Sequence, residues 1–376
     1  MKEKFSLKDH LFNAVKVALL ADAIKNVYPT FEKENFEQAV LVAFPRLELK
    51  ERIVHIRACL KKYLPADYQA AVGVLLSALP PPLDKNLTDD DFGDFIYAPY
   101  SDFVAHYGCT QEHLAFSLTA LKEMTQRFSA EDAIRYFINA FPKETLKTLY
   151  EWSNDDNYHV RRLCSEGTRP KLPWSQKINI QPAEALPILH QLFADKTRYV
   201  TRSVANHLND IAKIQPDTVV ETLKIWKNSG KQQETEMSFI LKHSTRTLVK
   251  NGHEEALTLL GFGNSDGLTV SNLTHDEAVK IGESLAFSFN ISATEAKQIV
   301  IDYLVYFQSK QGTLTNKKVF KLQTIDIASN KPVALQKRHV FRADMTTRTL
   351  YTGVHKIEIQ INGTIMAAFE FDLLAS

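Results

Sequence analysis

Apolar and polar residues alternate at helical spacing from the N-terminus to about residue 258. The first stripe lies within residues 11–19, at Leu11, Phe12, Val15, Ala18 and Leu19. Steps of three and four residues place such positions on one face of a helix. Similar stripes follow, separated by prolines that end helices, at residues 36–43, 49–60, 68–79, 112–128 and 130–140. The pattern predicts short helices that form consecutive pairs.

The helix pairs repeat along the chain. HVRRLCSEG (159–167) aligns with YVTRSVANH (199–207), which begins 40 residues later, and STRTLVKNG (244–252) is a weaker third copy. Two-helix units that recur every 40–47 residues, roughly, are typical of HEAT and armadillo repeats. We therefore predict a mostly α fold, a HEAT-like α-α superhelix of repeated helix pairs whose second helices line a concave wall.

The pattern changes after residue 267. Apolar and polar residues now alternate one by one in segments rich in Val, Ile, Phe and Tyr, at 285–291, 299–307, 317–325, 339–345, 355–363 and 366–374. This period is typical of half-buried strands, and Asn362-Gly363 is a strong signal for a two-residue hairpin turn. We predict a C-terminal all-β, immunoglobulin-like sandwich. The core disulfide is missing because this part of the chain has no cysteine.

The segment GFGNSDG (261–267) separates the two patterns. Its glycines follow the spacing GxGxxxG, with no strand before them and no clear helix after them, which disfavours a dinucleotide-binding loop. A flexible linker between domains is the simpler interpretation. We expect a domain of helical repeats over residues 1–260 and the sandwich over residues 268–376.

Composition narrows the function classes. The 376 residues carry a net charge of +1, so any nucleic-acid surface must come from local clusters of charge. Three distant cysteines without a CxxC pair argue against a zinc ribbon or a disulfide framework and fit a reducing cytoplasm. Apolar runs stay shorter than the 18 or so residues of a membrane span, and the histidines lack metal-ligand spacing. We expect no metal, no cofactor and no membrane partner.

Charged residues recur on one face of the repeat helices. Arg162 and Glu166 are four residues apart, and in the next repeat Arg202, Asn206 and Asp210 share a stripe. Taken alone, such a pair is explained by a solvated surface bridge worth a few tenths of a kcal/mol, roughly. The matching register in successive repeats favours a stripe of cations and carboxylates on the inner wall, and both interpretations stay open.

Two further residues have a structural and a functional interpretation. Glu131 follows Ser129 at the start of a predicted helix, where a capping box accounts for it; alternatively it is a second carboxylate that faces the same cavity. Trp174 ends the stretch TRPKLPW (168–174). It either packs beneath a stiff loop or offers a ring face for stacking and cation–π contact.

Several segments of the chain resemble the AlkC family of DNA alkylation-repair glycosylases, which are relatives of AlkD. The resemblance extends over nearly the whole chain, and its most specific part is SEGTRPKLPW, within HVRRLCSEGTRPKLPW (159–174). The other segments are LELKERIVHI (47–56), EDAIRYF (131–137) and YVTRSVANHLNDIAK (199–213). Some AlkC-type proteins also have an immunoglobulin-like C-terminal domain, in keeping with the strand-rich end of this chain.

The resemblance implies hydrolysis of the N-glycosidic bond of cationic alkylated bases, chiefly N3-methyladenine and N3-methylcytosine, which leaves an abasic site. Glu166 and Trp174 match the family's active-site carboxylate and tryptophan, and Glu131 matches a further acidic position. Asp210 is the expected remaining catalytic acid. The implied partner is double-stranded DNA with alkylated bases, bound by a monomer in the bacterial cytoplasm.

Six cations are the expected contacts to the DNA backbone: Arg161, Arg162, Arg169, Lys171, Arg202 and Arg246. Two readings without catalysis remain open. One is a HEAT-repeat scaffold that binds a protein along its concave face, and the other is a protein that binds damaged DNA without cleaving the glycosidic bond.

Overall fold

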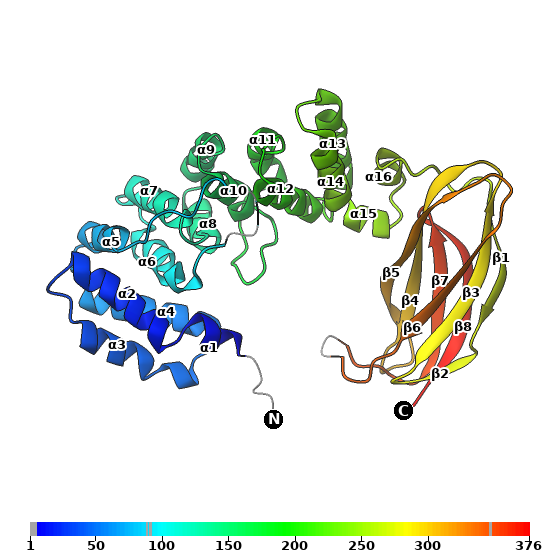
Figure 1. The fold of residues 1–376 in the computed structure, drawn as a ribbon, viewed down its shortest axis with the longest axis horizontal. Helices are drawn as coiled ribbons and strands as arrows, with labels where there is room; N and C mark the ends of the chain where they lie inside the picture. The colour runs from blue at the N-terminus through cyan, green and yellow to red at the C-terminus, as the bar shows by residue number, and fades with distance from the viewer. Residues whose placement is uncertain (1–5, 88, 90–91, 346–347) are drawn as a thin grey trace. The chain divides into compact units, whose positions relative to one another are not determined.

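The computed structural model describes residues 6–87, 89, 92–345 and 348–376, with helices first and strands after them (Figure 1). The helices are α1 (Leu7–Leu11), α2 (Ala14–Val27), α3 (Lys33–Leu41), η1 (Phe44–Arg46), α4 (Leu49–Tyr63), α5 (Tyr68–Ser77), η2 (Phe95–Tyr97), α6 (Ala98–Gly108), α7 (Leu114–Thr125), α8 (Glu131–Ala140), α9 (Pro142–Trp152), α10 (Tyr158–Gly167), α11 (Pro182–Leu192), α12 (Arg198–Ile211), α13 (Pro216–Ser229), α14 (Glu234–Ser244), α15 (Arg246–Lys250) and α16 (Glu254–Leu259). None of these described helices is both long and apolar enough to cross a bilayer.

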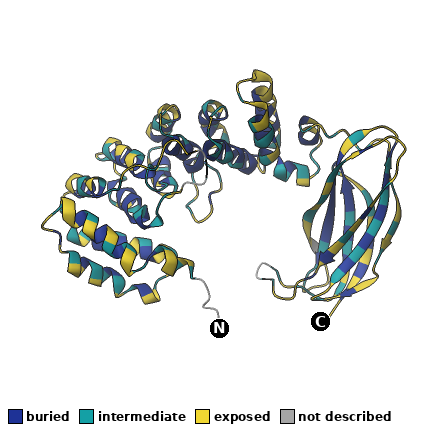
Figure 2. Cartoon of the chain, in the orientation of Figure 1, coloured by how far each residue is buried: buried dark blue, intermediate teal, exposed yellow. Residues whose placement is uncertain are grey.

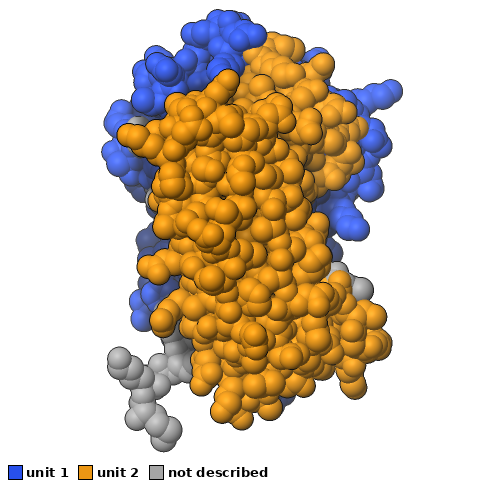
Figure 3. All heavy atoms as spheres, turned by 90° about the vertical axis from the view of Figure 1, so that its right-hand side faces the viewer, with its two compact units in different colours: residues 1–211, 226–243 blue, residues 212–225, 244–376 orange. Residues whose placement is uncertain are grey.

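The chain forms two compact units, which Figure 3 shows in different colours. One unit contains residues 1–211 and 226–243, and the other contains residues 212–225 and 244–376. The predicted order of a helical-repeat part and an all-β part is confirmed. The division of the chain into domains at residues 260–268 stays a prediction.

Helices α10 and α12 form the interior of the first unit. Helix α10 contacts α8, α9, α11 and α12, and every one of its residues except Arg161 is buried. Figure 2 shows the same for most of α12. A surface helix buries only its apolar stripe, so the polar face of α10 must be covered as well. That burial places Arg162 and Glu166 inside the protein rather than in water.

Local interactions set the two ends of α10. Its N-cap is Asn157, whose side chain accepts a hydrogen bond from the backbone N–H of His159 at 2.8 Å. The helix therefore begins at Tyr158. Gly167 is its last residue, and a Cβ there would lie 2.5 Å from Ile134 Cγ2 on α8. Glycine at this position allows α8 and α10 to approach closely beside Glu166.

The second unit contains a sandwich of two sheets. Its strands are β1 (Leu268–His275), β2 (Ala278–Lys280), β3 (Ser284–Ala293), β4 (Lys297–Gln308), β5 (Leu314–Ile327), β6 (Val333–Val340), β7 (Gly353–Ile361) and β8 (Thr364–Leu374). One sheet has the order β1-β3-β6 and the other β2-β8-β7-β4-β5, antiparallel except for the pair β2 and β8. Alternate residues of β3 and β7 enter the core, as the period of two predicts.

The hairpin and one strand boundary test the strand predictions in detail. Asn362 and Gly363 both have positive φ and join β7 to β8, with Ile361 opposite Thr364, so the predicted hairpin is confirmed. The segment 339–345 is not one strand, because β6 ends at Val340. The sequence pattern also misses the short strand β2, which pairs with β8.

The predicted flexible linker, residues 261–267, is fastened to the sandwich. The side chain of Asn362 donates a hydrogen bond to the carbonyl of Gly263 at 2.8 Å. Ser265 bonds to Thr364 at 2.8 Å, and Lys297 donates to the carbonyl of Asp266 at 2.7 Å. Helices α15 and α16, which precede the segment, belong to the same compact unit as the strands. The structure thus attaches the segment to the strands, and the interpretation as a flexible linker stays a prediction.

Two helical glycines should respond in opposite ways to alanine. Gly167→Ala forces a Cβ against Ile134 and should cost about 1–3 kcal/mol of stability, as overpacking does. Gly73→Ala on α5 meets nothing within 4 Å and should keep or raise stability, because alanine favours helices by about 1 kcal/mol. Thermal unfolding followed by circular dichroism measures both. Equal melting temperatures for the two variants would contradict the close approach of α8 and α10.

Candidate functional site

Five charged side chains gather where α8, α10, α12 and the loop after α10 meet. They are Glu131, Arg162, Glu166, Arg169 and Asp210, and we call them the inner charge cluster. Glu166 and Asp210 are each 5% exposed and Arg162 is 6% exposed. Charged groups are rarely buried to this extent unless they are paired. Three carboxylates against two guanidiniums leave one formal negative charge on the cluster.

Glu166 is held from two sides. One carboxylate oxygen, Oε1, accepts a hydrogen bond from Arg169 Nη1 at 2.6 Å and lies 3.6 Å from Arg162 Nη2. The other, Oε2, accepts from Ser203 Oγ at 2.6 Å. Ser203 lies on α12, so the next repeat fixes the orientation of this carboxylate.

Arg169 joins the two buried acids. Its Nε and Nη2 atoms donate to Asp210 Oδ2 at 3.0 and 2.9 Å, while Nη1 donates to Glu166. The predicted stripe on α12 therefore meets the predicted stripe on α10 through one guanidinium. A planar guanidinium with donors on several edges suits this bridge, which an ammonium group cannot reproduce.

Glu131 enters the cluster through Arg162. Arg162 Nη1 donates to Ser129 Oγ at 2.5 Å and forms an ion pair with Glu131. Its guanidinium carbon lies 4.9 Å from the centroid of the Tyr199 ring, within cation–π range. The expected capping box is wrong: the N-cap of α8 is Ala130, without a side-chain cap, and Ser129 donates to the Glu131 carboxylate itself.

Neighbouring opposite charges stabilise the ionised forms of Glu166 and Arg169. Burial raises the pKa of Glu166, but the charges of Arg162 and Arg169 and the hydrogen bonds from Ser203 and Arg169 outweigh it, so its pKa lies below the ordinary value. Burial lowers the pKa of Arg169, yet Glu166 and Asp210 raise it above its ordinary value. The Glu166 carboxylate therefore stays negative at neutral pH.

Trp174 lies on the loop after α10 and is 67% exposed, with φ of +66°. Lys50 on α4 donates a hydrogen bond to its carbonyl oxygen. Beside it is a cavity of about 140 Å³, lined among others by Trp174, Glu131, Phe95 and Phe128. Trp174 thus shares a cavity with Glu131, whereas Glu166 and Asp210 are outside its lining. The interpretation of a ring packed beneath the loop is wrong.

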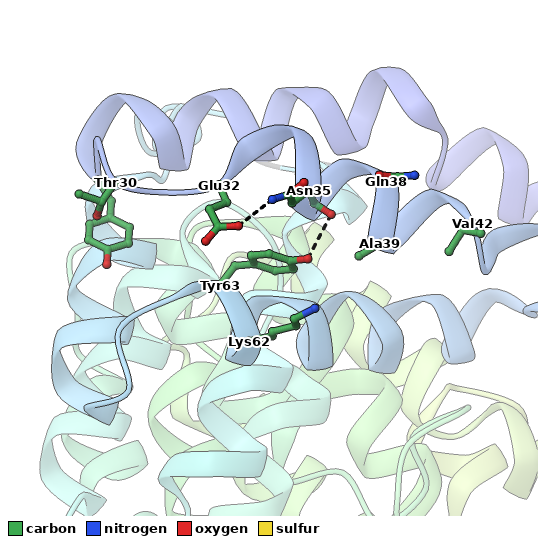
Figure 4. Close-up of a pocket in the computed structure, with 9 residues that line it drawn as sticks. Thr30, Glu32, Asn35, Gln38, Ala39, Val42, Lys62 and Tyr63 are labelled. Carbon is green, nitrogen blue, oxygen red and sulfur yellow. Dashed lines mark hydrogen bonds between the residues drawn. The ribbon is translucent and has the colours of Figure 1, made fainter.

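A larger hollow of about 670 Å³ lies among the N-terminal helices (Figure 4). Asn35 donates to Glu32 at 2.7 Å, and the Tyr63 hydroxyl donates to the carbonyl of Asn35 at 3.3 Å. These three residues thus bond to one another, and none of the expected site residues lines the hollow.

The other expected DNA contacts have varied surroundings. Arg161 bridges to Asp195, with Nε 2.5 Å from Oδ2, and Arg202 pairs with Asp89. Lys171 is exposed, and Arg246 begins α15 in the second unit. Their contacts to a DNA backbone stay predictions. The same holds for Arg162 and Arg169, whose guanidiniums form ion pairs with carboxylates of the cluster in this structure.

Arg135 was not predicted to take part in the site. It is fully buried on α8 and donates hydrogen bonds to the carbonyls of Gly167, Arg169 and Gln176. Its position four residues after Glu131 places both side chains on one helical face. That spacing, together with an arginine inside an apolar stripe, is the signal the sequence offers.

Comparisons with known proteins agree with these features. A family model for "DNA alkylation repair enzyme" matches residues 107–247, and one for "Uncharacterised protein YhaZ, C-terminal Ig-like domain" matches residues 269–375. The chain is 33% identical over 368 residues to "Uncharacterized protein YhaZ" of Bacillus subtilis (strain 168), which covers 96% of this chain and 98% of that protein.

A solved structure matches this chain over nearly its full length. The chain is similar to the Pseudomonas fluorescens alkylpurine DNA glycosylase AlkC bound to DNA containing an abasic site analog, with a TM-score of 0.86 and 32% identity over 99% of this chain and 100% of that chain. The chain belongs to the AlkC family of DNA alkylation repair proteins. The family-model match over residues 269–375 confirms the predicted immunoglobulin-like character of the sandwich.

The inner charge cluster of this AlkC-family chain lies entirely within the alkylation-repair match, as does Trp174. Among the residues that the structure describes, no group of three or more His, Cys, Asp or Glu side chains is arranged to hold a metal ion.

The lowered pKa of Glu166 makes stability depend on acid. The ordinary value is 4.5, so the stabilisation is complete above about pH 5 and is lost as the pH falls through the lower folded value. The melting temperature of the wild type should thus fall more steeply on acidification than that of Glu166→Gln, which cannot titrate. Glu112→Gln, at an exposed position, should follow the wild type. Parallel curves for all three proteins would contradict a pKa of Glu166 that is lowered in the folded state.

Proposed function

We propose that this protein is a DNA glycosylase that hydrolyses the N-glycosidic bond of cationic alkylated bases, such as N3-methyladenine and N3-methylcytosine, and leaves an abasic site. The observation that carries the proposal is the pair of buried carboxylates, Glu166 and Asp210, bridged by one guanidinium. Similarity over 99% of the chain to an alkylpurine DNA glycosylase supports it. We place its action on double-stranded DNA in the bacterial cytoplasm, as a monomer.

The leaving group determines what the protein must supply. Methylation at N3 gives the base a positive charge, so the base departs as a neutral molecule and needs no general acid. Positive charge then develops on the deoxyribose as the bond breaks. A carboxylate fixed close to the sugar stabilises this oxocarbenium-like state and can orient the attacking water.

Glu166 and Asp210 are suited to that role because their positions are fixed before the reaction. Ser203 and Arg169 hold Glu166, and Arg169 holds Asp210. A preorganised group of this kind is worth about 3 kcal/mol in the transition state, or about a hundredfold in rate. Glu131 would add a third carboxylate from the side of the Trp174 cavity.

Trp174 supplies a different interaction. Its ring is largely exposed beside the cavity that Glu131 also lines. The face of an indole attracts a cation, so it can hold either the methylated base or the edge of the sugar. Recognition then depends on the charge of the lesion and its weakened pairing, and no sequence specificity is expected.

The arginines of the cluster reduce the repulsion between its acidic side chains and a polyanionic substrate. Arg162 and Arg169 neutralise two of the three carboxylates in this structure. Phosphates that approach compete with the carboxylates for these guanidiniums, because Arg binds both groups through the same paired donors. We propose that Arg161, Lys171, Arg202 and Arg246 contribute further backbone contacts, which fix register without reading bases.

Amide variants test the catalytic role directly. Glu166→Gln and Asp210→Asn should cut the single-turnover excision of N3-methyladenine at least about tenfold and keep or tighten DNA affinity, because the carboxylate stabilises the transition state but repels phosphates. Excision is measured by heating the treated DNA in alkali and quantifying strand breaks at the released bases.

Glu236→Gln is the matched control. Glu236 pairs with Arg198 in the neighbouring repeat, with Oε2 2.5 Å from Nη2, and its loss should leave the rate unchanged. Unchanged excision in both cluster variants would remove Glu166 and Asp210 from catalysis. A wild type that binds methylated DNA and leaves it intact would be a damage-binding protein, and one that ignores DNA would be a scaffold.

A further inference from the structure

Arg135 is a buried cation bonded to neutral groups. The residue is 0% exposed, and its hydrogen bonds go to backbone carbonyls: Nε to Gln176 at 2.7 Å, and Nη1 to Gly167 at 3.0 Å and Arg169 at 2.8 Å. Burial lowers the pKa of Arg135, against the opposing charge of Asp132. Placing a charge inside a protein without a bonded carboxylate is costly, so the contacts it makes require an explanation.

The three carbonyls lie at the two ends of one loop, residues 167–176. Gly167 ends α10, Arg169 follows it, and Gln176 lies two residues after Trp174. The proposed chemistry needs two side chains from this loop, the Arg169 guanidinium and the Trp174 ring. Both residues lie within the segment from Gly167 to Gln176. One turn further along α8, Asn139 donates to the carbonyl of Lys177 at 2.9 Å and accepts from the N–H of Asn179 at 2.9 Å. Helix α8 thus fastens the whole loop.

We propose that Arg135 is a positioning residue for base excision: by holding the loop 167–176 on α8, it places the Arg169 guanidinium between Glu166 and Asp210 and Trp174 beside its cavity. The proposal rests on the proposed function. The most direct support is that one guanidinium edge bonds the carbonyl of Arg169 itself, whose side chain bridges the two acids.

Geometry explains why the residue is an arginine. Its planar group presents Nε toward one end of the loop and Nη1 toward the other, with fixed angles between the donors. The carbonyl of Gly167 lies at the C-terminus of α10, where the helix dipole favours a cation. A lysine ammonium at this site can reach one end of the loop, and a glutamine amide carries no charge.

Arg52 offers a matched control in the N-terminal repeats. It is also buried, at 3% exposed, and donates to the carbonyls of Lys8, Phe12 and Phe44 at 3.0, 2.8 and 3.0 Å, with a further ion pair to Asp9. Its partners carry no part of the proposed site. Replacing either arginine thus removes comparable buried bonds, and only one of them holds the loop.

The experiment compares Arg135→Lys, Arg135→Gln and Arg52→Gln in the full chain. Three measurements are made: single-turnover excision of N3-methyladenine, affinity for DNA with an abasic site analogue, and the rate of trypsin cleavage after Lys171. Arg135→Gln should slow excision at least about tenfold, since misplacement of a catalytic group by 1 Å or so costs up to about a hundredfold. Arg135→Lys should retain more activity than Arg135→Gln, and trypsin should cut both faster than the wild type.

The control separates positioning from loss of stability. Arg52→Gln should lower the melting temperature about as much as Arg135→Gln, yet keep excision and protection at Lys171. DNA affinity should stay within about threefold in all variants, because the loss concerns the transition state. Excision reduced equally by Arg52→Gln and Arg135→Gln would overturn the proposal.

The outcomes also distinguish this proposal from the proposed function. If the wild type releases bases and Arg135→Gln does so at the same rate, the function stands and the positioning role is overturned. If the wild type releases no bases, the proposed function fails and no excision role remains for Arg135. The trypsin measurement then still decides whether Arg135 holds the loop in place.

Discussion

The bridge that Arg169 makes between Glu166 and Asp210 is the contact on which the rest of the helical unit depends. A carboxylate taken out of water must gain cations and donors or else take up a proton. Here one guanidinium satisfies two carboxylates, one at the end of α10 and one at the end of α12. The same contact therefore joins two repeats and helps to lower the pKa of Glu166.

An acidic site in a protein that binds nucleic acid faces opposing demands. Ground-state repulsion by phosphates weakens binding, whereas the negative charge is useful only when the sugar becomes positive. Arg162 and Arg169 reduce this repulsion because they form ion pairs with the acids of the cluster. Under the proposed function, DNA would meet a nearly balanced group of charges in place of three bare carboxylates.

Much of the fold could be predicted from sequence because each helix pair and each strand must bury a defined face, and the Arg162–Glu166 stripe follows from spacing alone. Contacts between residues far apart in the sequence could not be predicted, because they depend on the path of the folded chain. Arg169 meets Asp210 across 41 residues, Arg162 meets Glu131 across 31, and Asn362 fastens Gly263 across 99. The local capping pattern at Ser129 was misleading because a distant arginine competes successfully for the same carboxylate.

The attachment of residues 261–267 to the sandwich has a practical consequence for dividing the protein. A fragment that stops at residue 260 would retain α15 and α16 but lose the strands that belong to the same compact unit. The hydrogen bonds that attach Gly263 and Asp266 to Asn362 and Lys297 would be lost with those strands. Aggregation of that fragment would therefore have no bearing on whether the helical repeats fold independently.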